Sequence, residues 1–257
     1  MPVSDELGDY LLHKAHLYNQ PDFITEDPIS IPHRFSNPKD IEIMGFWIAM
    51  LAWGQRKTII NKGLELVELM DGAPYDFIRH HSEKDRKRFL NFKHRTFQAT
   101  DTLYFLAFLQ QHYGQHESLE EAFIPYGKQG EQFTVKESLT HFHNVFFSLP
   151  YAPKRTQKHV ATPARKSTCK RLNMFLRWMV RKDNKGVDFG IWNKIKPEQL
   201  YIPLDVHVER IAREHGLLRR KSRDWKAVEE LSRAAREIHP EDPALLDYAL
   251  FGISVYG

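Results

Sequence analysis

Apolar residues recur at intervals of three and four along most of the chain, as they do on one face of an α-helix. Alternation with a period of two, which would indicate β-strands, is sparse. The helical spacing is present near residues 4–19, 41–53, 57–70, 75–90, 99–113, 131–147, 168–182, 205–215, 222–237 and 243–256. These patterns predict an all-α fold.

The segment 41–53 differs from the other predicted helices because it is apolar on nearly every face. Its uninterrupted apolar run covers eleven residues, 43–53. A bilayer span takes about 20 residues, so this run is too short to cross a membrane. We expect a central buried helix, with Asp40 as its N-cap.

Composition excludes several classes of site. Hydrophobic residues make up 42% of the 257 residues, which is enough for a substantial core. The single cysteine, Cys169, excludes an internal disulfide and a cysteine-ligated zinc or iron–sulfur site. His141 and His143 would lie on different faces of a helix, so we predict no metal site and no other cofactor. Without a recognisable signal peptide, a cytoplasmic location with no membrane partner is expected.

Basic residues gather in one part of the chain. Residues 138–182 contain no Asp or Glu and hold ten cations: Lys154, Arg155, Lys158, Arg165, Lys166, Lys170, Arg171, Arg177, Arg181 and Lys182. A polyanion that releases counterions on binding is the natural partner of such a stretch, which points to nucleic acid. The alternative is a solvated face with acidic neighbours folded against it.

Asp205 stands where a helix should begin. Pro203 disfavours helix just before it, and apolar residues at helical spacing follow it. Helix capping alone would explain this aspartate, with a contribution of about 1 kcal/mol.

Lys170 opens the predicted helix 168–182, directly after a proline-containing basic loop with a tight hairpin expected near 162–168. The apolar stripe of that helix is bordered by a polar stripe of Lys170, Asn173, Arg177 and Arg181. A lysine here could donate to phosphate or, with a lowered pKa, act as an amine nucleophile. A merely exposed lysine is the simpler alternative.

Gln55 lies in an unusual polar junction between two predicted helices, after Gly54 and before Arg56 and Lys57. A glutamine side chain can hydrogen-bond the edges of bases. An ordinary polar turn would show the same residues.

Together, these features resemble the helix-hairpin-helix DNA glycosylase superfamily, which includes endonuclease III, the adenine mismatch glycosylase and the 8-oxoguanine glycosylases. Lys-Arg-Leu-Asn at 170–173 is similar to the Lys-x-x-Asn/Asp of its bifunctional members. Leu-Asp-Val-His-Val at 204–208 is similar to the Val-Asp-x-His-Val that opens their next major helix. Residues 52–55 resemble the helix end whose glutamine enters the gap left by an extruded base, and 248–251 resemble the closing helix of 8-oxoguanine glycosylases.

The resemblance covers roughly residues 40–256 and departs from the superfamily at the hairpin. Ala-Arg-Lys-Ser-Thr-Cys at 164–169 replaces the glycine-rich turn whose amides approach a DNA phosphate. The archaeal 8-oxoguanine glycosylases also have an atypical hairpin and a long separation between the lysine and the aspartate. The chain thus looks like a bacterial branch nearest to that archaeal group.

The resemblance implies base-excision repair of duplex DNA, in which a damaged base, an oxidised purine for the nearest branch, is flipped out and its N-glycosidic bond is cleaved. It implies Lys170 as the nucleophile, with abasic-site lyase activity, and Asp205 as the carboxylate that stabilises the cationic sugar. The DNA-binding residues that we predict are Gln55, Arg56, Lys57, Lys166, Arg171, Asn173 and His207.

The same resemblance implies a single glycosylase-like unit over residues 1–257, acting as a monomer. The N-terminal helix and residues from about 150 to 257 would form one half and residues from about 40 to 148 the other, with a cleft between them. Two other functions remain open from the residues: a non-catalytic nucleic-acid-binding module on the same scaffold, and an unrelated helical enzyme or interaction protein. The lesion, and the choice between DNA and RNA, are not assigned by the sequence.

Overall fold

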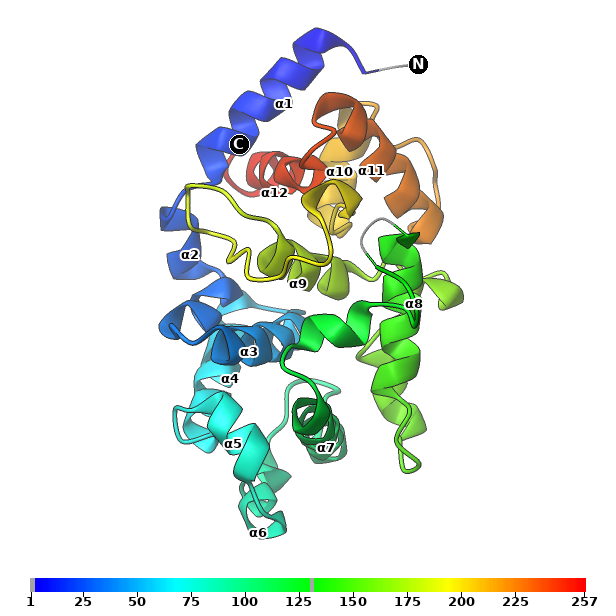
Figure 1. Ribbon diagram of the computed structural model, residues 1–257. Helices are drawn as coiled ribbons and strands as arrows, with labels where there is room; N and C mark the ends of the chain where they lie inside the picture. Colours follow the sequence, from blue (N-terminus) through cyan, green and yellow to red (C-terminus); the bar gives the residue numbers. More distant parts are fainter. Residues whose placement is uncertain (1–2, 130–131) are drawn as a thin grey trace. The chain divides into compact units, whose positions relative to one another are not determined.

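The computed structural model describes residues 3–129 and 132–257 (Figure 1). Within these ranges the chain forms helices and no β-strand, with one isolated bridge between His94 and Phe97. The predicted all-α class is therefore confirmed. None of the helices in the described ranges combines the length and apolar character needed to span a membrane.

The chain divides into two compact units. Unit 1 comprises Met1–Thr25, Lys128–Leu139 and Thr162–Gly257, and unit 2 comprises Glu26–Gly127 and Thr140–Ala161. The helices of unit 1 are α1 (Asp5–Tyr18), α9 (Lys170–Val180), α10 (Val206–Glu214), α11 (Trp225–Ile238) and α12 (Leu246–Tyr256). Those of unit 2 are α3 (Pro38–Leu51), α4 (Arg56–Leu69), α5 (Pro74–His80), α6 (Glu83–Arg86) and α7 (Ala99–Gln115).

Two helices contain residues of both units, namely α2 (Asp22–Glu26) and α8 (Val135–Phe146). The connections include short 3₁₀ helices at Pro28–Ser30, Pro32–Arg34, Lys87–Asn91, Leu119–Phe123, Lys154–Lys158, Pro163–Arg165, Pro197–Gln199 and Pro243–Leu245.

Helix α3 is buried at the centre of unit 2, as its apolar pattern predicts. Every residue from 41 to 51 is buried, and Phe46 and Trp47 pack against aromatic rings that include Phe105. The predicted N-cap was wrong. The helix begins three residues earlier because Asn37 accepts from the Lys39 amide and proline occupies the first turn, whereas Asp40 accepts from the amide of Tyr75.

Unit 1 is built around α12, which packs against α1 and α10. Gly252 lets α12 approach α1 closely, because a side chain at this position would overlap the ring of Tyr18. The apolar stripe of α9 is buried in the same unit, where Phe175 packs edge-on against Trp192. This core fixes the starts of α9 and α10, which carry Lys170 and Asp205.

Candidate active site

The turn that leads into α9 contains no glycine, and two of its residues have positive φ. Lys166 has φ 61° and Cys169 has φ 49°, a conformation that costs an L-residue roughly 1–2 kcal/mol. The turn is held by local hydrogen bonds: Cys169 N–H donates to Ser167 Oγ at 3.1 Å, and Asn173 Nδ2 donates to Thr168 O at 3.1 Å. The backbone therefore reverses here without glycine, and Lys170 becomes the first residue of α9.

Asn173 supports this turn and does not face solvent. We expected it to contact DNA, but its side chain is buried, with 1% of the residue exposed. It lies less than one helical turn after Lys170, and its bond to Thr168 ties the helix to the turn before it. Asn173 is therefore a structural brace of the lysine's position, which corrects the sequence-based assignment.

Asp205 is the N-cap of α10, as its sequence position predicts. Its Oδ1 accepts from the backbone amides of His207 at 2.9 Å and Val208 at 3.1 Å. These two bonds occupy one carboxylate oxygen and fix the orientation of the group. The second oxygen, Oδ2, takes no part in the cap.

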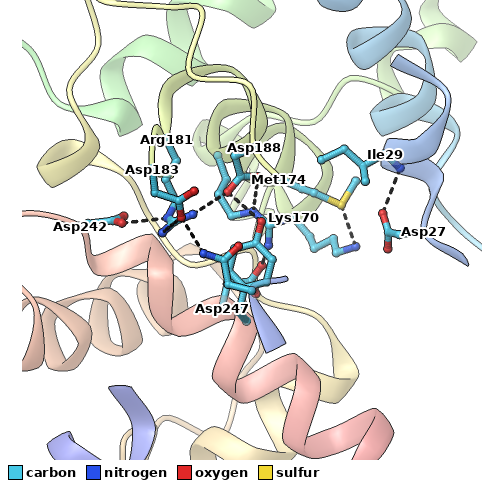
Figure 2. Close-up of polar contacts among 12 residues, drawn as sticks. Asp27, Ile29, Lys170, Met174, Arg181, Asp183, Asp188, Asp242 and Asp247 are labelled. Atoms are coloured by element: carbon cyan, nitrogen blue, oxygen red, sulfur yellow. Dashed lines mark hydrogen bonds and ion pairs between the residues drawn. The ribbon is translucent and has the colours of Figure 1, made fainter. Parts of the chain in front are cut away.

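The structure brings Lys170 and Asp205 together. Lys170 Nζ lies 3.6 Å from Asp205 Oδ2, which is longer than a hydrogen bond of about 2.7–3.2 Å. The amine donates instead to the thioether of Met174 at 3.4 Å, a weak acceptor (Figure 2). Because the two side chains are 26% and 23% exposed, a substrate can reach both groups.

Cys169, the neighbour of Lys170, is unsuited to act as the nucleophile in its place. Its side chain is buried, and this burial raises the pKa of the thiol to about 12. The thiol therefore stays protonated near neutral pH, whereas thiolates are the reactive form of cysteine.

Arg177 in α9 and Arg181, the C-cap of that helix, form an internal ion-pair network in place of the polar surface predicted for them. Arg177 and Arg181 are 4% and 2% exposed. Both contact Asp188, at 3.3 Å and 3.1 Å, and Figure 2 shows Arg181 also among Asp183 and Asp242. Acidic residues thus fold against this part of the basic stretch, as in the alternative that its charge left open, but the two arginines are buried and do not form a solvated face. These arginines cannot hold a DNA backbone from the interior.

Asp247, on α12, links this network to the Lys170–Asp205 pair. Its carboxylate forms a buried ion pair with Arg177. Burial raises the pKa of Asp247 to about 6, with Arg177 opposing the rise and the negative charge of Asp205 adding to it. A second carboxyl group, held by Arg177, therefore interacts electrostatically with the candidate site.

The remaining predicted residues lie in both units. In unit 1, Lys166 and His207 are exposed and Arg171 is half-buried, while His207 Nδ1 lies 3.1 Å from Ser254 Oγ. In unit 2, Gln55 is the exposed N-cap of α4, and its side chain makes no capping bond. Arg56 and Lys57 form the first turn of the same helix.

Comparison with protein families places the whole candidate site inside one conserved-domain match. The family described as a protein of unknown function (DUF2400) matches residues 27–256. The chain belongs to this family. No curated protein matches the chain, and no solved structure does.

Sequence reasoning missed the acidic partners of α9 in the DUF2400 chain. Asp188 lies eleven residues after Arg177, and Asp247 lies seventy residues after it, so no local sequence pattern connects the arginine with its partners. One signal was present: two arginines four residues apart, one in the last turn and one at the C-cap of a helix whose other faces are largely apolar. Such a pair, in a short and well-buried helix, indicates internal carboxylate partners as readily as a phosphate-binding face.

Proposed function

We propose that this protein is a DNA base-excision repair glycosylase with abasic-site lyase activity. The observation that carries the proposal is the 3.6 Å approach of Lys170 Nζ to Asp205 Oδ2 at two adjoining helix starts. A lysine amine is the side chain that forms Schiff bases, and a carboxylate beside it can accept the proton that the amine must lose. The resemblance to the helix-hairpin-helix glycosylases adds support from the same two positions.

The proposed reaction begins with an unprotonated Lys170 and a nucleotide flipped out of the duplex. The amine lone pair forms a bond to the anomeric carbon, while the bond to the base breaks and the base leaves with its electron pair and takes up a proton. Opening of the sugar ring then gives an imine between Lys170 and the sugar. Loss of a proton from the adjacent carbon expels the 3′ phosphate and nicks the strand.

Asp205 contributes in two ways through its uncapped oxygen. Positive charge develops on the sugar as the glycosidic bond breaks, and a fixed carboxylate stabilises it without having to reorganise. The same Oδ2 can accept the proton of Lys170 before attack. Because Oδ1 is bound by two backbone amides, the group stays oriented throughout the reaction.

Binding of DNA is supported by the exposed cations of the turn before α9. Arg165 and Lys166 are both exposed, directly ahead of Lys170. Phosphate contacts from such residues set the register of a duplex without reading its sequence. Gln55, exposed on unit 2, remains our candidate for the residue that fills the gap left by the flipped base.

Single-turnover assays of base release and strand cleavage test the proposal. The substrates are labelled duplexes with 8-oxoguanine, an oxidised pyrimidine, uracil or an abasic site, and an undamaged duplex is the control. We expect one damaged substrate to be processed by the wild type and Lys170→Gln to lose cleavage at the abasic site. Salt-sensitive DNA binding without reaction on any substrate would overturn the enzyme assignment and favour the non-catalytic binding module.

A further inference from the structure

A second cluster of cations lies outside the candidate active site, at the start of α11. Residues 219–226 contain five cations and one acid in eight positions: Arg219, Arg220, Lys221, Arg223, Asp224 and Lys226. The single acid is already engaged, since Asp224 caps α11 and forms an ion pair with Arg220 at 2.6 Å. The segment therefore carries a local excess of positive charge.

This segment borders an open groove of about 530 Å³ on unit 1, which we name the α11 groove. Its charged lining residues are Arg220, Lys221, Lys226, Glu229, Glu230 and Arg233. The two glutamates have other partners: Glu229 pairs with Lys136 at 2.9 Å, and Glu230 accepts from the Arg219 amide at 2.7 Å.

Three exposed cations of the groove have no carboxylate partner in the described residues. Within residues 3–129 and 132–257, no carboxylate pairs with Lys221, Lys226 or Arg233. These side chains keep their charge available to an external anion. Surface cations that remain unpaired beside engaged carboxylates are suited to a polyanion, because binding releases the counterions around it.

The groove offers charge but no stacking surface. Trp225 is its nearest tryptophan in sequence, and it is buried, with its Nε1 donating to Glu229 at 2.9 Å. Recognition of unpaired bases normally uses exposed aromatic rings, whereas a duplex backbone needs only cations and polar groups. The lining therefore fits phosphates of duplex DNA better than unstacked bases.

The groove also adjoins the turn that carries Lys166. Trp225 N–H donates to Lys166 O at 3.1 Å, which joins the first residue of α11 to that turn. Lys166 is exposed and lies four residues before Lys170. The start of α11 and the turn before α9 are thus joined in unit 1, and both carry exposed cations.

We infer that the α11 groove is a second DNA-contacting surface, which binds backbone phosphates of the duplex that flanks the damaged nucleotide. This inference rests on the proposed function for the identity of the polyanion. Its contacts are independent of sequence and of the lesion. They lengthen the duplex segment that the protein holds while Lys170 acts.

The test compares two double variants of the full-length protein that remove equal charge. Lys221→Ala/Lys226→Ala removes two unpaired cations of the groove, and Lys84→Ala/Lys87→Ala removes two exposed lysines of unit 2. Affinity for a labelled undamaged duplex is measured over a salt series, with circular dichroism as the control for folding. Arg233→Ala, measured in the same way, provides an independent single variant one to two turns farther along the groove-lining face of α11.

We expect the groove variant to lower the slope of log affinity against log salt by about 1.8, since each lost phosphate contact contributes about 0.9. Affinity should fall by roughly tenfold or more at moderate salt, and the unit 2 variant should leave the slope unchanged. An unchanged slope in the groove variant, or equal losses in both double variants, would overturn the inference.

Activity separates this inference from the proposed function. At saturating protein, the groove variant should release the base at the wild-type rate, because its lysines do not touch the reacting atoms. Wild-type catalysis together with an unchanged salt slope would remove only the groove assignment. A lowered slope in a protein without glycosylase activity would keep the groove as a DNA-binding surface and remove the proposed enzyme function. A wild type that does not bind duplex DNA would overturn both.

Discussion

Asp205 faces Lys170 with the carboxylate oxygen that its helix cap leaves unused. Oδ1 accepts from two backbone amides at the start of α10, and Oδ2 lies 3.6 Å from Lys170 Nζ. One side chain therefore combines a structural role with a position beside a nucleophilic amine. Capping requires only a hydrogen-bond acceptor, whereas the proposed catalytic role requires the negative charge. Substitutions that keep the acceptor and remove the charge can therefore separate the two roles.

Asp205→Asn should reduce base release strongly while leaving the fold intact. Asparagine caps a helix about as well as aspartate, so the free energy of unfolding should change by less than about 1 kcal/mol. The negative charge near the sugar is lost, and base release in single-turnover assays should fall by roughly a hundredfold or more. Asp205→Ala should show the same catalytic loss and a further destabilisation of about 1 kcal/mol. Equal activity in Asp205→Asn and the wild type would show that Asp205 acts only as a helix cap and has no catalytic role.

Asp247 should make stability fall as pH rises. Its usual pKa is 3.8 and burial raises it to about 6 in the folded protein, so the folded state holds the proton more tightly. Its contribution to stability is complete below pH 3.8 and is lost as pH rises through about 6. Asp247→Asn does not titrate, so its free energy of unfolding relative to the wild type should increase by up to about 3 kcal/mol over that interval. Urea unfolding of both proteins along a pH series measures this, and a constant difference would contradict it.

Lys166→Gly should be more stable than Lys166→Ala. Lys166 has φ 61°, a conformation that costs an L-residue roughly 1–2 kcal/mol and costs glycine little. Both variants lose the same charge, so they should bind duplex DNA equally and more weakly than the wild type. Paired urea unfolding curves should favour the glycine variant by about 1 kcal/mol. Alanine matching or exceeding glycine would show that the turn relaxes without strain.

Sequence was most informative where structure depends on neighbours in the chain. The N-cap at Asp205 follows from Pro203 and the apolar spacing after it, and the structure has the cap there. The start of α3 shows that two nearby candidate N-cap residues cannot be distinguished by local sequence alone. Asn37, followed by proline, competes with Asp40 for the same role, and only the fold reveals that Tyr75 engages Asp40 instead.

The surroundings of α9 could not be predicted from the sequence, because they are formed by contacts between residues far apart in the chain. In the sequence, Arg177 and Arg181 look like a solvent-facing stripe. In the structure, Arg177 pairs with Asp247, 70 residues later in the chain, and Arg181 pairs with Asp242, 61 residues later. The cost of burying a guanidinium is offset only by such partners, so their positions decide which face of the helix is internal. The charge excess at residues 219–226 became informative for a related reason, because the fold shows which of its cations lack carboxylate partners.

Borohydride trapping on duplex DNA tests the central claim, an amine nucleophile at Lys170, most directly. Reduction converts an imine between protein and sugar into a stable bond, and mass mapping of the trapped peptide identifies the residue that carries it. We predict a covalent complex with a duplex that contains a damaged base or an abasic site, attached at Lys170 and lost in Lys170→Gln. Attachment at another residue, or trapping that survives in Lys170→Gln, would contradict the assignment of Lys170 as the nucleophile.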